Sequence, residues 1–450
     1  MSHLSVAPNQ ADLDSVLAAL AERGVDVIRV LWSDLHGVAR GKDVLIDSFA
    51  GLLDGGLGFC QTLMITDLGA NPLTGSELAD PNYPDAKLRP ELAGFRIVPW
   101  EPNVAVVLAS VLDTDGSPLP ISPRDALVNV TRGMSQSGRT ALIGPELEFY
   151  LFHRETDAFG SLVPYLARAT AGYIVGVEHD EQRILGRILR QCHQFGLDVF
   201  AGNHEFSGGQ FEVNQMHSEA VSAADRAFLL RHAVKEIAST ADLRATFMGK
   251  PMDDRAGSGF HIHLSLVDDA GRNVFADEAD SDGLSSVARS FLAGVLECAP
   301  ALTGILNPTV NAFKRLAPGS LAPSSASWGL DDRTAAVRIP PERGGGTRLE
   351  VRVGDATANP YLAFAALLAA GMDGVERAAV PPSAEMSAHG GAALPTNLAA
   401  ALDELEKSTV LRDALGASLI DTFCALKRQE IARFDQAVTD WEIREYARLL

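Results

Sequence analysis

Apolar side chains recur three and four residues apart in several stretches of the chain, the spacing that places them on one face of an α-helix. The pattern is clearest in residues 223–241, where Phe228, Leu229, Val234 and Ile237 are expected to be buried. The same spacing predicts helices over residues 11–23, 223–241, 285–303, 361–371 and 411–427.

Two short segments near the start of the chain have the composition of β-strands. Residues 25–32 are β-branched and apolar, and residues 38–46 follow them after the turn sequence Asp34-Leu-His-Gly37. Two such segments joined by a short turn predict a β-hairpin. Residues 96–112 hold further strand-like sequence.

A turn-rich segment, Asp113-Thr-Asp-Gly-Ser-Pro118, separates these early strands from the rest of the chain. We place a domain boundary near residue 115, which gives a first domain of residues 1–115 and a second of residues 116–450. Beyond the boundary, long helices are set against a separate group of strands. This arrangement predicts a mixed α+β fold.

Composition and charge narrow the classes of function. The 450 residues are 46% hydrophobic and 21% charged, values that are ordinary for a globular protein and exclude a disordered or fibrous chain. The formal net charge is −20. Because nucleic-acid binding needs a basic face, we expect no nucleic-acid partner.

The cysteines and the apolar runs bear on the compartment. The cysteines lie far apart, and none belongs to a C-x-x-C pair, which is typical of free thiols in a reducing compartment. The first ten residues lack the pattern of a secretory signal. The longest apolar run, residues 361–370, is about half of what spans a bilayer. We therefore expect a cytoplasmic protein with no membrane partner.

Four segments of the second domain place polar side chains on one face of a strand, where residues i and i+2 point the same way. Each segment alone could be a half-buried strand with its polar face in water. Together, however, they put carboxylates, imidazoles and guanidinium groups on one side. The residues concerned are Glu146 and Glu148, Glu205 and Glu212 (joined by a turn at 207–209), His261 and His263, and Arg348, Glu350 and Arg352.

Carboxylates gathered in this way repel one another unless cations lie between them. Oxygen-rich ligand sets with little histidine suit Mg²⁺ or Mn²⁺ rather than zinc, so we expect two or more divalent cations. Arginines recur nearby at Arg315, Arg333 and Arg338. Their simplest role is surface solvation, but Arg338 follows an apolar run, which favours a buried role.

No glycine-rich phosphate-binding motif is present. Metals and arginines would therefore hold any phosphate, as they do in many phosphoryl-transfer sites.

The order and the amino-acid sequences of these segments resemble those of the glutamine synthetase family. The resemblance covers nearly the whole second domain, through residues 144–149, 204–213, 257–265, 307–323, 333–340, 348–352 and 359–363. It implies a small N-terminal β-grasp domain and a large catalytic domain with a curved antiparallel sheet flanked by helices. It also implies a homo-oligomeric double ring, a dodecamer, in which the first domain completes the neighbour's site.

The family's reaction uses ATP and glutamate as substrates, and the matching motifs imply roles for single residues. One divalent metal would be held by Glu148, Glu205 and Glu212, and a second by Glu146, His261 and Glu350. The residues implied on the ATP and phosphate side are His263, Arg333 and Arg338. Those implied on the glutamate side are Gly257, Arg315 and Arg352. The residues implied in catalysis are Arg333, Arg338 and Glu205.

The chain departs from the family pattern in the pocket for the nitrogen donor. Leu321 stands where the family has a glutamate, and Cys60 stands where it has an aspartate. Both changes remove the negative charge that a small ammonium cation needs. We therefore interpret the chain as a γ-glutamyl–amine ligase whose amine pocket includes Leu321 and Cys60. The loss of acidic groups favours a monoamine, such as ethanolamine, an alkylamine or an arylamine, over a polyamine.

Two other functions stay open from the sequence. One is a glutamine synthetase that uses ammonium through an unusual site. The other is a non-catalytic ring protein that binds nucleotide. A third departure, at Ala256 in the loop that frames the acid substrate, leaves some room for an acid other than glutamate.

Overall fold

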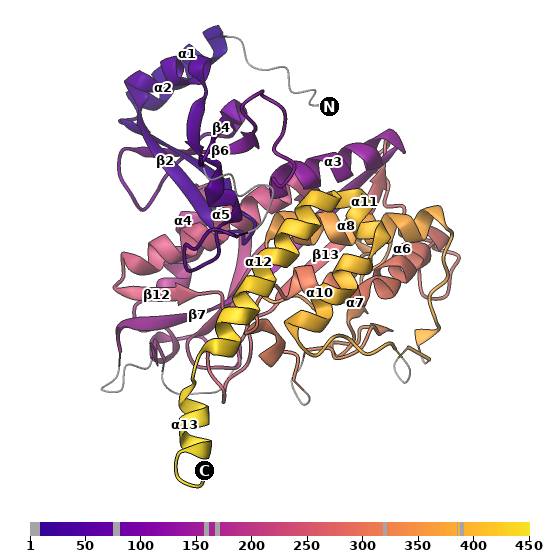
Figure 1. The fold of residues 1–450 in the computed structure, drawn as a ribbon. Coiled ribbons are helices and arrows are strands. Elements are labelled where there is room, and N and C mark those ends of the chain that lie inside the picture. Colours follow the sequence, from indigo (N-terminus) through magenta and orange to yellow (C-terminus); the bar gives the residue numbers. More distant parts are fainter. Residues whose placement is uncertain are drawn as a thin grey trace.

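The computed structural model describes residues 10–74, 82–156, 162–166, 172–317, 322–384, 386–387 and 391–450. Within these residues the strands form two separate sheets, and most of the helices pack against the larger one (Figure 1). The mixed α+β fold predicted from the sequence is therefore confirmed.

The smaller sheet contains the predicted hairpin, whose two strands pair antiparallel. Its order is β2-β1-β6-β4-β3, with β5 on β6, and β1 and β6 are the parallel pair. Its strands are β1 (Val27–Ser33), β2 (Ala39–Leu45), β3 (Leu57–Cys60), β4 (Asp85–Pro90), β5 (Arg96–Ile97) and β6 (Val104–Leu112). Helices α1 (Gln10–Glu22) and α2 (Ile46–Gly55) accompany them.

The larger sheet is built around one long strand, β7 (Arg139–Thr156), and its order is β14-β15-β16-β13-β7-β10-β9. Three short strands, β8 (Leu162–Pro164), β11 (Ser218–Glu219) and β12 (Leu243–Thr246), also pair with β7. The remaining strands are β9 (Val199–His204), β10 (Gln210–Gln215), β13 (Phe260–Asp268), β14 (Trp328–Leu330), β15 (Val337–Ile339) and β16 (Leu349–Val351).

Helices cover one face of this sheet. Phe260 of β13 contacts Phe364, with ring centroids 5.9 Å apart, and Tyr361 contacts Phe228 at 5.7 Å. These rings are fully buried, so this face forms the core. The helices of the larger unit are α3 (Pro123–Gln136), α4 (Ile184–Gln194), α5 (Ala220–Ser239), α6 (Ser286–Glu297), α7 (Ala299–Leu306), α8 (Pro360–Glu376), α10 (Leu398–Lys407), α11 (Thr409–Leu415), α12 (Ala417–Gln436) and α13 (Asp440–Tyr446).

Two of the stretches predicted as single helices each form two helices in the structure. The helix expected over residues 285–303 is two helices, α6 and α7, which meet at an angle of 72°. The helix expected over residues 411–427 is broken at Gly416, whose φ of +95° is accessible mainly to glycine. In both cases the apolar spacing continues across the break, because each half buries its own apolar face.

The turn between β1 and β2 attaches the smaller sheet to the helical layer. The Asn359 amide, which caps α8, donates to the Asp34 carbonyl at 3.0 Å. Lys427 Nζ of α12 lies 2.9 Å from His36 Nδ1. These buried contacts fix the smaller sheet relative to the core of the larger one.

Among the described residues, no single helix has both the length and the hydropathy to cross a membrane. Helices α6 and α7 together have a length and composition that could do so, but the pair is bent.

Candidate active site

The strand register gathers the predicted polar residues into one row on the face of the larger sheet that the core helices leave uncovered. Glu146 of β7 lies opposite His261 of β13. On the other side of β7, Glu148 lies opposite Glu212 of β10. The alternation inferred from the sequence is thus correct, because Leu147 of the same strand is buried in the core.

The row continues across the next two strands. Glu350 of β16 lies opposite His263 of β13, and Arg338 of β15 lies opposite Glu350. The turn at residues 207–209 joins β9 and β10 as an antiparallel pair, with Phe211 opposite His204. This hairpin brings Glu205 close enough for its charge to act on Glu212.

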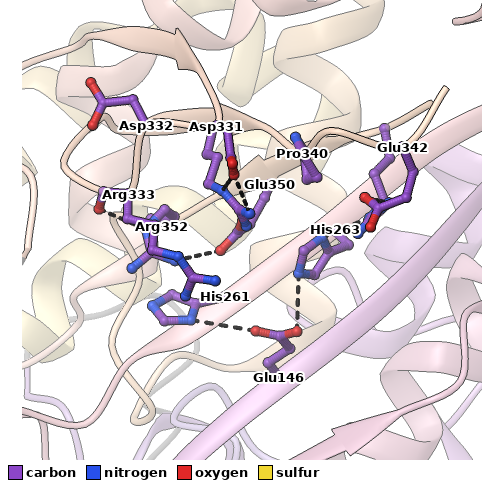
Figure 2. Close-up of polar contacts among 12 residues, drawn as sticks. Glu146, His261, His263, Asp331, Asp332, Arg333, Pro340, Glu342, Glu350 and Arg352 are labelled. Atoms are coloured by element: carbon purple, nitrogen blue, oxygen red, sulfur yellow. Dashed lines mark hydrogen bonds and ion pairs between the residues drawn. The ribbon is translucent and has the colours of Figure 1, made fainter. Parts of the chain in front are cut away.

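Glu146 is shared by both histidines of the row (Figure 2). Its Oε2 lies 3.6 Å from His261 Nδ1, and its Oε1 lies 3.1 Å from His263 Nε2. Burial alone would raise the pKa of Glu146, but hydrogen bonds from the two histidines outweigh it and hold the pKa well below its ordinary value. Glu146 is therefore ionised and lies at the centre of the candidate metal site.

Two groups of side chains have ligand atoms within 4.8 Å of one another. One contains Glu146, Glu212 and His261, and the other contains Glu146, His263 and Glu350. These groups draw on residues from both predicted ligand sets and add His263. Oxygen-rich sets with one imidazole each fit Mg²⁺ or Mn²⁺. The division of the ligands between two metals stays a prediction.

The glutamates on β9 and β10 carry unfavourable charge that a cation would relieve. Burial and the charge of Glu148 raise the pKa of Glu205 to about 7. Burial and the charges of Glu146, Glu148 and Glu205 also raise the pKa of Glu212. Since carboxylates bind metal only when ionised, metal binding must displace these protons.

We expect the apparent affinity for Mn²⁺ to fall when the pH is lowered from about 8 to about 6, by up to about tenfold per unit for each proton displaced. The sign follows from the raised pKa values. In the unfolded chain these carboxylates ionise near 4.5, so the metal-free fold loses stability as the pH rises through about 7. Thermal unfolding with and without Mn²⁺ at several pH values measures both effects. An affinity independent of pH would contradict the prediction, and Glu205→Gln should flatten the dependence.

Both oxygens of Glu350 are held by arginines, one of which, Arg352, is labelled beside Glu350 in Figure 2. Arg338 Nη1 donates to Oε2 at 2.5 Å, and Arg352 Nη1 donates to Oε1. Glu350 is only 1% exposed. Although burial opposes ionisation, the nearby histidines and arginines keep its pKa below the ordinary value. Asp331 completes the group, because its Oδ1 accepts from Arg338 Nη2 at 2.6 Å.

The predicted glutamate-side residues lie together at the end of β13. The buried Arg315 donates to the carbonyls of Val353, at 3.1 Å, and Arg352, at 3.3 Å. A Cβ on Gly257 would lie 2.6 Å from Arg315 Cγ. Burial lowers the pKa of Arg315, and the charge of Glu148 opposes that effect. The close approach of the chain to the aliphatic stem of Arg315 depends on glycine at position 257.

Gly259 lies where three predicted functional groups converge. A Cβ at this position would be 2.9 Å from His261 Nε2, 3.0 Å from Arg315 Nη2 and 3.2 Å from Glu148 Oε1. Its backbone N–H donates to Glu148 Oε2 at 2.8 Å. Gly259 thus joins the metal side of the site to the glutamate side.

Two predicted residues lie outside this row, and a third is not among the residues that the structure describes. Arg333 is exposed, and its carbonyl accepts from Arg352 Nε at 3.1 Å. Cys60 ends β3 of the smaller sheet and is partly buried. Leu321 lies outside the described residues. Their roles stay predictions.

Sequence reasoning missed the side chains that support the carboxylates. Gln210 Nε2 donates to Glu148 Oε2 at 3.0 Å, and Asn203 Nδ2 donates to Glu205 Oε1 at 2.7 Å. Each lies two residues from a predicted ligand. The same period-two rule, extended from charged residues to amides, could have found them.

Comparison with known proteins adds to this geometry. A model of the glutamine synthetase catalytic domain matches residues 120–446. The chain is 33% identical over 448 residues to a glutamine synthetase of Halobacterium salinarum, covering 96% of each. It is 39% identical over 381 residues to that of Methanococcus maripaludis, covering 81% of this chain and 84% of the relative.

Two solved structures have the same fold. One, described as a GmaS/ADP complex, matches with a TM-score of 0.84 and 33% identity over 96% of this chain and 99% of that one. The other, described as a novel glutamine synthase homolog, matches with a TM-score of 0.83 and 28% identity over 95% and 99%.

Proposed function

The chain belongs to the glutamine synthetase family of carbon–nitrogen ligases, and we propose that it is an ATP-dependent γ-glutamyl–amine ligase. In this reaction a γ-carboxylate oxygen of glutamate attacks the γ-phosphorus of ATP, and ADP leaves. The amine nitrogen then attacks the γ-carbonyl carbon, phosphate leaves and the nitrogen gives up a proton. The row of carboxylates, imidazoles and arginines on one sheet face is the observation that carries this proposal.

The residues of the row suit the parts that the reaction needs. Divalent cations at the Glu146-centred groups would offset the charge of the phosphate oxygens. Arg338 and Arg352 already point at the same carboxylate, so they can also face phosphoryl oxygens. Arg315, buried beside Gly257, is suited to hold a substrate carboxylate. Glu205, whose charge acts on Glu212, would share a metal with Glu148 and Glu212 and take part in catalysis.

The choice of nitrogen donor rests on the two departures in the amine pocket, because overall identity does not separate the alternatives. The two relatives named glutamine synthetase are 33% and 39% identical to the chain, and the GmaS structure is 33% identical. Leu321 and Cys60 replace two acidic groups of the family pattern. We therefore propose a monoamine such as ethanolamine, an alkylamine or an arylamine.

The second candidate is a glutamine synthetase that uses ammonium, which the names of the listed relatives favour. Phosphate release with ATP, Mg²⁺ and glutamate, measured against ammonium and a panel of amines, separates the two. Turnover with an amine but not with ammonium supports the ligase. Turnover with ammonium alone overturns the assignment of Leu321 and Cys60.

We expect Leu321→Glu, combined with Cys60→Asp, to raise the rate with ammonium by about tenfold or more. The two carboxylates restore attraction for a small cation, and each charge-assisted hydrogen bond contributes about 1.5–3 kcal/mol. The measurement is phosphate release at several ammonium concentrations. Asp115→Glu, at an exposed turn with its own Ser117 contact, is the control. An unchanged ammonium rate would show that the two positions do not face the nitrogen donor.

The proposal includes a cytoplasmic homo-oligomeric double ring, a dodecamer, in which residues 1–115 complete the site of a neighbour. Helix α13 supports an assembly, because it projects from the body of the subunit in Figure 1 with Trp441, Ile443 and Tyr446 exposed. Apolar side chains exposed together in this way are typical of subunit contacts. On this proposal Cys60 faces the neighbour's amine pocket.

A further inference from the structure

Helix α12 has two charged side chains on its buried side, Lys427 and Glu430. The Lys427 side chain is 1% exposed and the Glu430 side chain is 13% exposed. Lys427 Nζ lies 3.4 Å from Glu430 Oε2 and 2.9 Å from His36 Nδ1, in the turn between β1 and β2. The His36 ring is fixed in turn, because its Nε2 lies 3.0 Å from the Thr66 carbonyl. The ammonium group of Lys427 therefore holds one oxygen of Glu430 toward the smaller sheet.

The other oxygen of Glu430 contacts the segment that leads to Arg315. Glu430 Oε1 accepts from the Val310 backbone N–H at 3.1 Å. Residues 309–315 form a tight turn, in which the N–H groups of Ala312 and Arg315 donate to the carbonyls three residues earlier, at 3.1 and 3.0 Å. Glu430 thus joins α12 to the turn that ends at the guanidinium proposed to hold a substrate carboxylate.

The same turn also holds the loop that contains Gly257. The Asn311 side chain pairs with the backbone of Lys250, because its Oδ1 accepts from the N–H and its Nδ2 donates to the carbonyl, each at 2.8 Å. The carbonyl of the preceding residue, Gly249, accepts from the Ser258 N–H at 2.9 Å. A Cβ on Gly257 would lie 2.6 Å from this carbonyl oxygen. Both parts of the proposed glutamate side are therefore attached to one turn.

Helix α12 contacts this turn at a second point, which is the weaker one. Lys314 Nζ lies 5.9 Å from the ring centroid of Phe434. Both side chains are exposed, and a cation–π contact is weak where water reaches it. A hydrogen bond from a backbone N–H to a carboxylate is stronger than an ordinary one. Glu430 is therefore the main attachment of the turn to α12.

We propose that Glu430 is a positioning residue for glutamate binding, which acts through Val310 on the turn that carries Arg315 and holds the Gly257 loop. Lys427 fixes Glu430 from the other side, since a buried ammonium group needs an anionic partner. The inference rests on the proposed function, because it takes Arg315 and Gly257 as the glutamate side. It deepens that function by placing a determinant of glutamate affinity in α12, 120 residues beyond the turn.

The test compares two double variants that both remove the ion pair. In Lys427→Met/Glu430→Gln the amide oxygen can still accept from Val310, whereas in Lys427→Met/Glu430→Leu no acceptor remains. Apolar side chains of similar volume often replace a buried ion pair without loss of stability. We expect the second variant to bind glutamate about threefold to tenfold more weakly than the first, the value of one hydrogen bond. Calorimetry with glutamate, Mg²⁺ and ADP measures the dissociation constant.

Steady-state kinetics separates positioning from a structural role. Positioning predicts a higher KM for glutamate, with kcat and the KM for ATP unchanged within about twofold. A purely structural role would lower kcat through loss of active enzyme and would leave both KM values unchanged. Arg428→Met is the matched control, because Arg428 lies in the same turn of α12 and its exposed guanidinium pairs with Glu406 at 2.7 Å. It should leave every constant unchanged.

The outcomes separate this inference from the proposed function, because the binding experiment needs no nitrogen donor. If the two double variants bind glutamate equally well, the inference is wrong and the ligase function stands. If the wild type binds no glutamate, the proposed function fails and the inference fails with it.

A single variant keeps the inference testable if Lys427→Met/Glu430→Leu does not fold. Glu430→Asp retains a carboxylate near Lys427 but draws it back from Val310 by one methylene group. It should weaken glutamate binding in the same direction, with the KM for ATP unchanged. An unchanged affinity for glutamate in Glu430→Asp would overturn the inference.

Discussion

Glu350→Gln should lower amine-dependent phosphate release by about a thousandfold while the fold and the assembly persist. Glu350 is the point where a candidate metal group and the two buried arginines meet. A neutral amide loses the metal ligand, and one of its two ends is an NH₂ group that cannot accept from a guanidinium. Losing a phosphate-neutralising arginine alone costs about 10³-fold or more in related chemistry.

The fold is expected to survive this change because each arginine keeps another partner. Arg338 retains Asp331, at 2.6 Å, and Arg352 retains the Arg333 carbonyl, at 3.1 Å. Phosphate release measures activity, and size-exclusion chromatography measures assembly. Glu297→Gln, in an exposed ion pair with Arg377, is the control and should remain fully active. Full activity of Glu350→Gln would overturn its place in the metal site.

The face of each site residue could be predicted from sequence because the side-chain period of a strand is two. Glu146 and His261 each lie on the predicted face. Their pairing across strands could not be predicted in the same way. Register depends on how the whole sheet packs, and a shift of one residue would move every side chain to the other face. The sequence therefore predicted which side chains share a face of a strand better than how they pair across strands.

The contact partners of the buried arginines were also harder to predict than their burial. Arg338 was predicted to be buried, and it is. Its partner Asp331 was not predicted, because the loop that returns Asp331 to β15 is set by the parallel pairing of β14 and β15. A cavity of about 560 Å³ beside β9 is likewise lined by α4 and by residues 173–176, and neither segment carries a local signal of that contact.

The helices show which local signals were underused. Pro300 lies in the first turn of α7, where proline is favoured, so it could have indicated the start of a second helix. Gly416 at the start of α12 is a similar signal. The spacing of apolar residues alone does not reveal these breaks, because it shows which side chains are buried and not whether the helix is continuous.

Gly259→Ala should lower turnover by about tenfold or more, although it adds only one methyl group. The new Cβ would lie within 3.2 Å of His261, Arg315 and Glu148 at once. His261 must shift, and the other two side chains must give by a few tenths of an ångström. This is less than the displacement of about 1 Å that can cost about 10²-fold at a reacting centre. Because the three groups belong to the metal side and the glutamate side, both Mn²⁺ affinity and the KM for glutamate should worsen together.

A simultaneous loss of Mn²⁺ affinity and increase in the KM for glutamate would distinguish Gly259 from a position that is only tightly packed. Gly133→Ala, in the exposed part of α3 with nothing within 4 Å of the added Cβ, should leave both quantities unchanged. Mn²⁺ binding by calorimetry and glutamate KM by phosphate release measure the two effects separately. If Gly259→Ala affected one and spared the other, the two halves of the site would be independent. In that case Gly259 would not be what fixes the metal ligands Glu148 and His261 relative to Arg315 on the glutamate side.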